Sequence, residues 1–576
     1  MSEKVLTRLC QELWVFLGTQ PGLSHAMQGC RQMKLLPFTI SDISLSKLSI
    51  IYPPDYLNNL AARLISHGGS SASAPLYEHA SPESLALLFF LFLVAVHLAT
   101  PRSRTENLLR KLPSPPFKLP IIGHLHLIGS LPHHSLRDLA KKHGPDVMLL
   151  RLGAVPTLVV SSPRAAKAVL RTHDHVIASR PHSVVADILF YGSTDVSFTP
   201  YGEYWRRARK VITTHLLTAA KVRSYRAARE QEVRLVLARV RAAAAAGTAI
   251  DVSEILGFFA NDIVCQAMTG RLPREQGRNQ LFRELLETNT KLLGGFNLDD
   301  YFPSLARFDL VSAKAVKHMK RWDDLLDSLI DKHKSKTLDG EDEGDFIDVL
   351  LSVQQEYGLT RDNIKAILMD TFEAGTDTTY IALDYAMAEL MQNPQSMNKL
   401  QAASRASTRL PKLITKDFLG KLAFLPINLK ESVRTHQGGP VLIPFLSVQS
   451  ECNVEGYTIP FGTRVIVNAW ALCRDTTYWE SAEEFMPERF MEEAMDAASD
   501  FRGNDFCFLL FGSGRRMCLG INFTTATFEI ILANLIYHFN WELPPVLTGI
   551  EMSESYGMDV HRNEKLLLIS RMAHDV

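Results

Sequence analysis

The sequence predicts a mainly α-helical protein with a minor β-region. Between about residue 163 and residue 393, apolar residues recur with helical spacing, and Ser162 is a suitable first cap for this block. Short strand-like runs lie outside the block, at 147–151, at 157–161 and around the turn at 460–462. Because the helical block is much longer than these runs, we expect one large helical domain that carries a small sheet.

The overall composition excludes several classes of protein. The chain has 576 residues, of which 46% are hydrophobic, so it can bury a large core. Its 62 Lys and Arg residues balance 62 Asp and Glu residues without a basic block, which argues against a nucleic-acid-binding protein. The seven cysteines are scattered and include no Cys-X-X-Cys pair, which is typical of a reducing compartment.

The segments before the main domain carry no recognisable chemistry. Residues 1–80 contain helical patches broken by prolines and end in a Gly- and Ser-rich stretch, so we expect a poorly ordered extension. Residues 84–100 are apolar and are followed by cations, which predicts a membrane anchor helix with the rest of the chain in the cytosol. A cleaved signal peptide is the alternative, but its charges would come first. A basic, proline-rich hinge at 101–123 then leads to the main domain at 124–576.

The longest predicted helix begins after Thr360, a suitable N-cap, and stops before Pro394. At 1.5 Å per residue it is about 50 Å long, enough to cross a domain. Its middle reads Ala-Gly-Thr-Asp-Thr-Thr over 374–379, where a structural helix would carry Leu. Gly375 costs about 1 kcal/mol relative to Ala, so we expect an offsetting role, such as space for a small reactant. A loosely packed core helix is the alternative.

A loop near the C-terminus, Phe-Gly-Ser-Gly-Arg-Arg-Met-Cys-Leu-Gly over 511–520, is built around one cysteine, Cys518. Gly514 and Gly520 permit backbone angles that are closed to other residues, so the chain can curl on both sides of the sulfur. Backbone N–H groups and a helix that begins at Gly520 would favour the thiolate. With Arg516 beside it, such a thiolate suits a metal cofactor that carries carboxylates.

Five positions of this loop resemble the haem-binding signature of the cytochrome P450 family: Phe511, Gly514, Arg516, Cys518 and Gly520. Further motifs of that family follow one another in the family's order from residue 112 onward. They are the Trp-X-X-X-Arg pair Trp205 and Arg209, the oxygen-activation stretch with Ala374, Gly375, Asp377 and Thr378, the Glu-X-X-Arg pair Glu431 and Arg434, and Arg489 of Pro-Glu-Arg-Phe. The sequence is most similar to plant A-type microsomal members, among them the grass indole and indolin-2-one monooxygenases.

The resemblance implies a cytochrome P450 fold that binds haem b, iron protoporphyrin IX, with Cys518 as the iron ligand. It assigns proton delivery to Asp377 and Thr378, and a buried structural core to Glu431, Arg434 and Arg489. The remaining cofactor contacts would come from Trp205, Arg209, Ala374, Gly375, Phe511, Arg516 and Gly520. The substrate pocket would draw on residues 185–197, 368–372, 441–443 and 555–558.

The implied reaction inserts one oxygen atom from O2 into a small hydrophobic molecule, with indolic plant metabolites as candidates. The sequence has no Gly-X-Gly-X-X-Gly stretch or flavin module, so NADPH would act only through a separate NADPH–cytochrome P450 reductase, with cytochrome b5 as a further candidate donor. The anchor implies the endoplasmic reticulum membrane, with the catalytic domain facing the cytosol.

The family pattern is interrupted between Pro426 and Phe445. Pro426 stands in or near the first turns of the Glu-X-X-Arg helix, and Gln437 to Pro440 replaces a usual Pro-Pro. Phe445 stands where the family offers Arg or His to a haem propionate, which predicts weaker haem retention unless its side chain has moved away from the haem. These changes keep open a haem-binding relative with impaired or no catalysis. A haem enzyme that rearranges peroxides is a second alternative, but the intact Asp377 and Thr378 argue against it.

Overall fold

A computed structural model describes residues 103–270, 278–308, 311–335, 344–406, 412–420, 422, 424–441, 445–491 and 503–573. The chain divides into two units, Met1–Ser103 and Arg104–Val576. The predicted extension at 1–80 and the predicted anchor at 84–100 lie outside the described residues. Within the described part of the chain, no helix is both long enough and apolar enough to cross a membrane.

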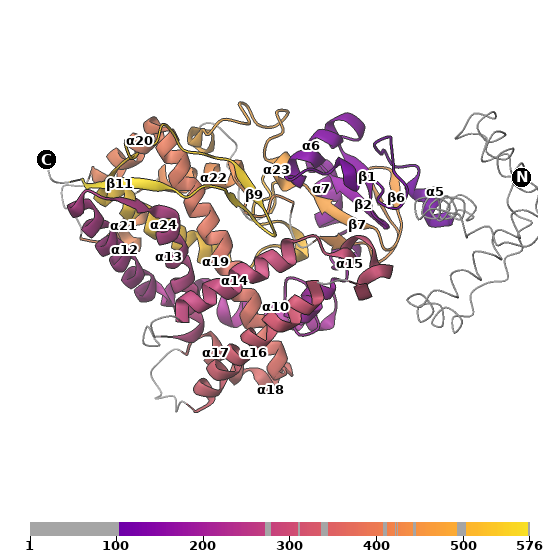
Figure 1. Cartoon of the computed structure of the whole chain (residues 1–576), viewed down its shortest axis with the longest axis horizontal. Helices are drawn as coiled ribbons and strands as arrows, with labels where there is room; N and C mark the ends of the chain where they lie inside the picture. Colours follow the sequence, from indigo (N-terminus) through magenta and orange to yellow (C-terminus); the bar gives the residue numbers. More distant parts are fainter. Residues whose placement is uncertain are drawn as a thin grey trace, which may run out of the picture. The chain divides into compact units, whose positions relative to one another are not determined.

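The unit Arg104–Val576 is mainly helical, as the sequence predicts (Figure 1). The helices are α5 (Arg104–Leu109), α6 (Pro132–His143), α7 (Pro163–Lys167), α8 (Asp174–Ile177), α9 (Val184–Leu189), α10 (Glu203–Val211), α11 (Ala219–Ser224), α12 (Arg226–Ala246), α13 (Val252–Thr269), α14 (Arg278–Gly294), α15 (Leu298–Tyr301), α16 (Val311–Ser335), α17 (Phe346–Ser352), α18 (Gln354–Tyr357), α19 (Arg361–Gln392), α20 (Pro394–Arg405), α21 (Lys416–Leu419), α22 (Phe424–Thr435), α23 (Ala469–Leu472) and α24 (Ile521–His538).

The minor β-region consists of small sheets. The largest has the order β1 (Val147–Leu152), β2 (Val155–Val160), β7 (Arg464–Val467) and β4 (Leu446–Ser447), with β2 and β7 parallel. The two predicted strands at 147–151 and 157–161 are thus confirmed as the β1–β2 hairpin. The other strands are β3 (Ala249–Asp251), β5 (Cys452–Val454), β6 (Tyr457–Ile459), β8 (Phe539–Glu542), β9 (Glu554–Tyr556), β10 (Val560–Arg562) and β11 (Leu567–Met572).

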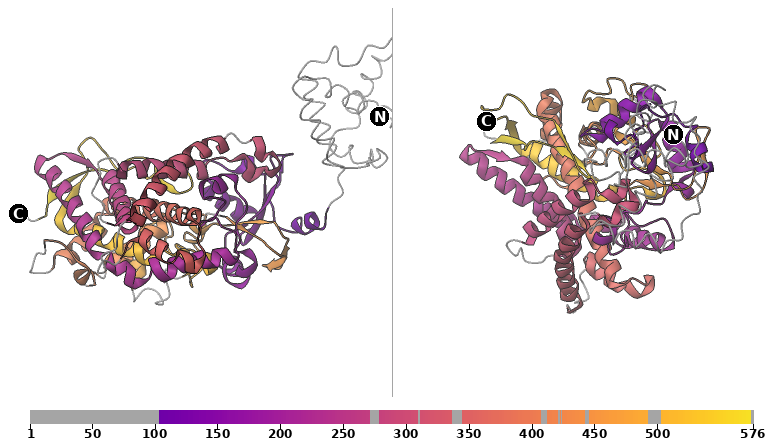
Figure 2. Two further views of the ribbon diagram at one scale, coloured as in Figure 1. Left: turned by 90° about the horizontal axis from the view of Figure 1, so that it is seen from below. Right: turned by 45° about the vertical axis from the view of Figure 1, so that its right-hand side comes forward.

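The sheet and the helical core occupy different ends of the unit. β1, β2 and β7 lie with α6 and α7 at one end, whereas α12 and α20 lie with β11 at the other (Figure 1). Seen from below, the indigo strands and the yellow C-terminal strands again lie at opposite ends (Figure 2). α19 runs between the two ends, so it can present residues to a site in the middle of the unit.

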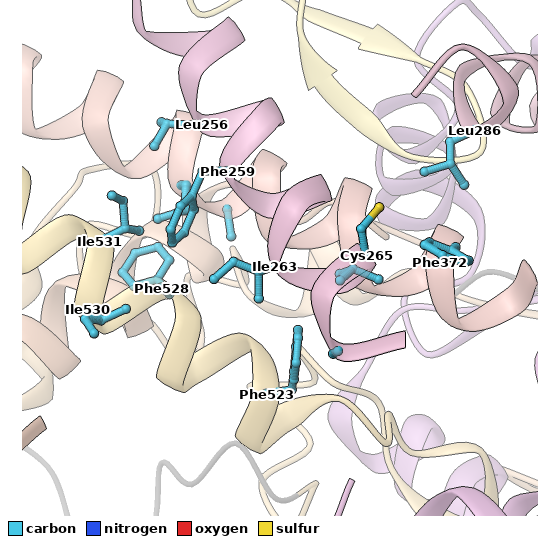
Figure 3. Packing of buried hydrophobic residues seen from close by; sticks show 14 of the residues in the cluster. Leu256, Phe259, Ile263, Cys265, Leu286, Phe372, Phe523, Phe528, Ile530 and Ile531 are labelled. Carbon is cyan, nitrogen blue, oxygen red and sulfur yellow. The ribbon is translucent and has the colours of Figure 1, made fainter. Parts of the chain in front are cut away.

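The predicted long helix is confirmed as α19. Thr360 and Asn363 form a capping box: the Thr360 hydroxyl accepts from the Asn363 N–H at 3.1 Å, and the Asn363 carbonyl accepts from the Thr360 N–H at 3.0 Å. The helix ends at Gln392, two residues before Pro394. α13, α19 and α24 bury apolar side chains against one another, including Phe259 and Ile263 beside Phe528 (Figure 3).

Pro426 is accommodated in the first turn of α22, which begins at Phe424. The first four N–H groups of a helix have no intrahelical acceptor, so a proline at the third position removes no helical hydrogen bond. The Glu-X-X-Arg helix therefore forms despite this departure from the family pattern.

Candidate functional site

The Cys518 loop is held by short backbone hydrogen bonds. The Cys518 N–H donates to the Phe511 carbonyl at 2.9 Å, and the Gly520 N–H donates to the Cys518 Sγ at 3.3 Å. Gly514 has φ +67°, and a Cβ there would lie 2.1 Å from the Leu170 carbonyl oxygen, so only glycine fits. The prediction was wrong for Gly520, which has an ordinary φ of −82° and serves as the N-cap of α24.

The electrostatics of Cys518 differ from the prediction in one respect. Burial raises the pKa of the thiol, whereas the Gly520 N–H and the Arg209 charge lower it by less. The protein alone therefore does not favour the thiolate, because one N–H group and one guanidinium do not offset the loss of water. A bound metal ion deprotonates a coordinating thiol outright, so ligation of iron would itself supply the thiolate.

α19 carries solvent-accessible residues near the Cys518 loop. Ala374 and Thr378, one turn apart, are exposed although most of the residues around them on the helix are buried. The Thr378 hydroxyl donates to the Ala374 carbonyl at 2.7 Å. Asp370 on α19 lies close enough to Cys518 for its charge to raise the pKa of the thiol. Cys518 keeps solvent-accessible surface although dense protein around it disfavours a charge, so the sulfur and the accessible residues of α19 fit a haem bound between them.

Gly375 has a packing role that the sequence did not predict. A Cβ at this position would lie 3.1 Å from Cγ2 of Val264 on α13, closer than most side-chain contacts. The missing side chain therefore lets α13 pack tightly against α19. Ala374 and Thr378, rather than Gly375, present the accessible face of the helix.

The predicted catalytic pair faces two different partners. The Asp377 carboxylate accepts from the Thr290 hydroxyl of α14 at 3.0 Å, and burial raises the pKa of Asp377 to about 6. Thr378 bonds to its own helix. Two further buried acids lie close to Asp377: burial and the Asp377 charge raise the pKa of Asp559 to about 8, and they raise the pKa of Glu373 well above its usual range. Glu373 could have been found in the sequence because it lies three residues after Asp370 and four residues before Asp377 on the same helix.

The structure brings Trp205, Arg209 and Arg516 together. The Arg516 and Arg209 guanidinium carbons lie 4.5 Å and 5.3 Å from the centre of the Trp205 ring. Arg516 donates to the carbonyls of Ala178, Val196 and Thr199, Arg209 donates to that of Met517, and the Trp205 N–H donates to that of Val196. A guanidinium has five N–H donors, so both arginines retain capacity for a haem carboxylate.

The structure also brings Glu431, Arg434 and Arg489 together. Glu431 and Arg434 are fully buried and form a bidentate pair at 2.8 and 2.9 Å, and Arg489 donates to the same carboxylate at 3.1 Å. Arg434 also donates to the carbonyls of Cys473, Ala482 and Glu484, at 2.7, 2.7 and 3.0 Å. This cluster ties α22 to the segment that precedes the cysteine loop.

The Cytochrome P450 family pattern matches residues 113–567. The chain belongs to the cytochrome P450 family. It is 54% identical to an indole-2-monooxygenase of Zea mays over 82% of this chain and 90% of the relative, and 51% identical to a 3-hydroxyindolin-2-one monooxygenase of Zea mays over 85% and 95%. A zebrafish cytochrome P450 solved with abiraterone has a TM-score of 0.66 at 22% identity, over 77% of this chain and all of that one. The chain is therefore a monooxygenase with haem as its cofactor.

Sequence reasoning missed Arg180, a half-buried cation close enough to Arg516 for the two charges to interact. Arg180 donates to the carbonyls of Ser197 at 2.7 Å and Phe445 at 3.3 Å. Burial and the charge of Arg516 lower the pKa of its guanidinium. The Phe445 ring itself packs against an apolar cluster and lies 5.4 Å from the Arg464 guanidinium carbon. The structure thus favours displacement of Phe445 and makes Arg180 a candidate propionate partner.

The predicted substrate segments divide into core and accessible residues. Leu368 and Phe372 are buried, and Phe372 stacks on Phe282 of α14 with ring centres 4.4 Å apart, so these two residues serve the core. Residues 442–443 lie outside the described residues. Residues 555–558 form the half-buried tip of the β9–β10 hairpin and remain available to a substrate.

Proposed function

We propose that this cytochrome P450 inserts one oxygen atom from O2 into a small bicyclic molecule of the indole class, with electrons from NADPH through a separate reductase. The observation that carries this proposal is the 54% identity to an indole-2-monooxygenase over 82% of the chain. The similar identity to a 3-hydroxyindolin-2-one monooxygenase supports the same substrate class.

The chain's own residues provide a thiolate ligand, a hydroxyl and an acid. Haem bound to Cys518 supplies the chemistry of O2 activation. Thr378 presents an accessible hydroxyl one turn from Ala374, and Asp377, with a pKa of about 6, can exchange a proton near neutral pH. Arg180, Arg209 and Arg516 supply the positive charge that a haem carboxylate needs inside a protein.

A cationic groove supports electron supply by a partner with an acidic surface. It has a volume of about 310 Å³ and lies beside the first turns of α24, which begins three residues after Cys518. Its charged lining residues are four cations and one acid, so they leave a net positive charge: Arg223, Arg226, Arg229, Lys416 and Glu529. The exposed cations Arg206, Arg207 and Lys210 of α10 lie on the helix that carries Arg209. We propose this face for NADPH–cytochrome P450 reductase and, as a second donor, cytochrome b5.

The location that we propose is the endoplasmic reticulum membrane, with the unit Arg104–Val576 in the cytosol. The support is the apolar segment at 84–100 and the cations that follow it in the sequence.

The direct test incubates the purified, haem-loaded full chain with reductase, NADPH and indole, indolin-2-one or 3-hydroxyindolin-2-one under ¹⁸O2. We expect a product that carries one ¹⁸O atom and forms only when NADPH and reductase are both present. A haem-loaded protein that consumes none of the three substrates would support the inert relative. Conversion of a lipid hydroperoxide without NADPH would support the peroxide-rearranging enzyme.

A further inference from the structure

Three metal-binding side chains converge at a point distant in sequence from the cysteine loop. His133 and His134 are neighbours in the first turn of α6, and Glu554 begins β9. The Nε2 atoms of His133 and His134 lie 2.8 Å and 3.2 Å from the same Glu554 oxygen, Oε2. The three ligand atoms lie within 4.8 Å of one another.

The site is enclosed but open on one side. The side chain of His133 is 0% exposed, that of Glu554 is 11% exposed and that of His134 is 40% exposed, so an ion could enter beside His134. Aromatic rings fix the orientation of His133: its ring centre lies 5.0 Å from Trp470 and 6.2 Å from Tyr556. Nδ1 of His133 is buried without a hydrogen-bond partner, so Glu554 holds this ring through Nε2 alone.

Nearby cations are balanced by a further carboxylate. Arg137 and Arg474 each lie 4.4 Å from the centre of the Trp470 ring. Arg137 pairs with Glu483 at 2.8 Å, and Arg474 pairs with the same residue at 3.1 Å. These pairs reduce the repulsion that an entering cation would meet.

We propose that His133, His134 and Glu554 bind a divalent transition-metal ion of the zinc class. Two imidazoles and one carboxylate form a donor set that Zn²⁺ accepts, with a water molecule as the fourth ligand. Metal–ligand distances of about 2.1 Å in a tetrahedron place the ligand atoms roughly 3.4 Å apart, close to the separations of His133 and His134 from Glu554. The geometry therefore requires only small adjustments.

Metal binding at this site would join α6 to the β9–β10 hairpin. The hairpin is already attached to α19 by the buried pair of Arg562 and Asp384 at 2.8 Å. It also carries residues 555–558, which are available to a substrate. A bound ion would thus fix one wall of the substrate region to the N-terminal part of the unit.

A second group of metal-binding side chains is occupied by hydrogen bonds that cap a helix. His333, Asp345 and Asp348 also place ligand atoms within 4.8 Å of one another. The Asp345 carboxylate accepts from the N–H groups of Ile347 and Asp348, and His333 binds both Asp345 and the Leu329 carbonyl. All three side chains are buried and bonded in this way, so the cluster caps α17 and carries no proposal.

The test uses the haem-loaded full chain without a polyhistidine tag, dialysed against buffered Zn²⁺ and then analysed for zinc and iron. Haem loading occupies Cys518, so the cysteine cannot contribute to zinc binding. We expect one Zn²⁺ per chain and a higher thermal unfolding midpoint. The variants His134→Ala and Glu554→Gln should weaken zinc binding at least about 10–100-fold, the range found for loss of even indirect metal contacts.

His126→Ala removes an exposed histidine outside the cluster and should leave zinc binding unchanged. His134→Ala changes a partly exposed side chain, and an unaltered haem content will show that the variant folds. Absence of stoichiometric Zn²⁺ in the unmodified chain would overturn the proposal. Equal zinc binding by the unmodified chain, His134→Ala and Glu554→Gln would also overturn it, because the ion would then bind elsewhere.

Discussion

Replacing Asp377 by Asn should stabilise the protein and impair its catalysis. The Asp377 carboxyl has a pKa of about 6, against an ordinary value of 3.8, because it is buried. A carboxyl whose pKa is raised on folding binds its proton more tightly in the folded state. Its contribution is therefore favourable at low pH, and stability is lost as the pH rises from about 4 through 6.

The size of this effect follows from the shift of about two pKa units. At 1.36 kcal/mol per unit, the charged carboxylate costs about 3 kcal/mol above pH 7. Asn keeps an oxygen that can accept from the Thr290 hydroxyl, so the variant loses the charge and retains the hydrogen bond. Removing this charge also lowers the pKa of Asp559, which favours the variant further at pH 7–8.

The assay is the thermal unfolding midpoint of haem-loaded protein between pH 4.5 and 8. At about 2.1 cal/mol/K per residue, the unit Arg104–Val576 has an unfolding entropy of roughly 1 kcal/mol/K, so Asp377→Asn should raise the midpoint by roughly 3 °C at pH 8. The difference should shrink to roughly 1 °C by pH 4.5, where about 1 kcal/mol of the effect remains, and product formation should fall. If the unfolding midpoints of the variant and of the unmodified protein changed equally with pH, the raised pKa of Asp377 would be refuted.

Asp327→Asn is a control that should change the stability of the protein in the opposite direction. Burial raises the pKa of Asp327, but hydrogen bonds and charges from Lys365 and Arg361 lower it below its ordinary value. A carboxyl whose pKa is depressed on folding stabilises the protein above its unfolded pKa. This variant should therefore be less stable than the unmodified protein at pH 7, and the difference should shrink as the pH falls below 4.

Three further substitutions test individual contacts. Arg434→Lys removes the bidentate pair and leaves backbone carbonyls without a donor, so it should cost about 3–5 kcal/mol and reduce the haem-loaded fraction on expression, whereas an unchanged fraction would contradict this role. Thr378→Ala should leave haem content intact but lower the ratio of product to NADPH consumed, and an unchanged ratio would show that proton delivery runs elsewhere. Phe445→Arg would bring a second guanidinium close to Arg464, so it should lower the unfolding midpoint. It should not slow the transfer of haem to apomyoglobin. Slower transfer would show that position 445 can contact a haem propionate.

Local features of the fold were predictable from the sequence. The start of α19 depends on Thr360 and Asn363, three residues apart, and its end depends on Pro394. Glu431 and Arg434 are close in sequence on one helix, so their pairing also follows from spacing. The comparisons confirm the family that the loop around Cys518 indicated.

Features that depend on distant segments were not predictable. The need for Gly375 comes from Val264 on a separate helix, which no pattern within α19 reveals. Arg180 belongs to no motif and matters only because the fold buries it beside Ser197 and Phe445. The thiol pKa of Cys518 was misjudged because the extent of its burial depends on the whole fold.

The carbon monoxide difference spectrum of the reduced protein tests most directly whether Cys518 is the haem ligand. The unmodified protein should give the thiolate-type band, and Cys518→Ala should abolish it, because no other side chain supplies that ligand. Cys507→Ala is the matched control: this half-buried thiol lies eleven residues earlier, burial raises its pKa to about 12, and its loss should leave the band unchanged. A thiolate-type band that survives in Cys518→Ala would contradict the account at its centre.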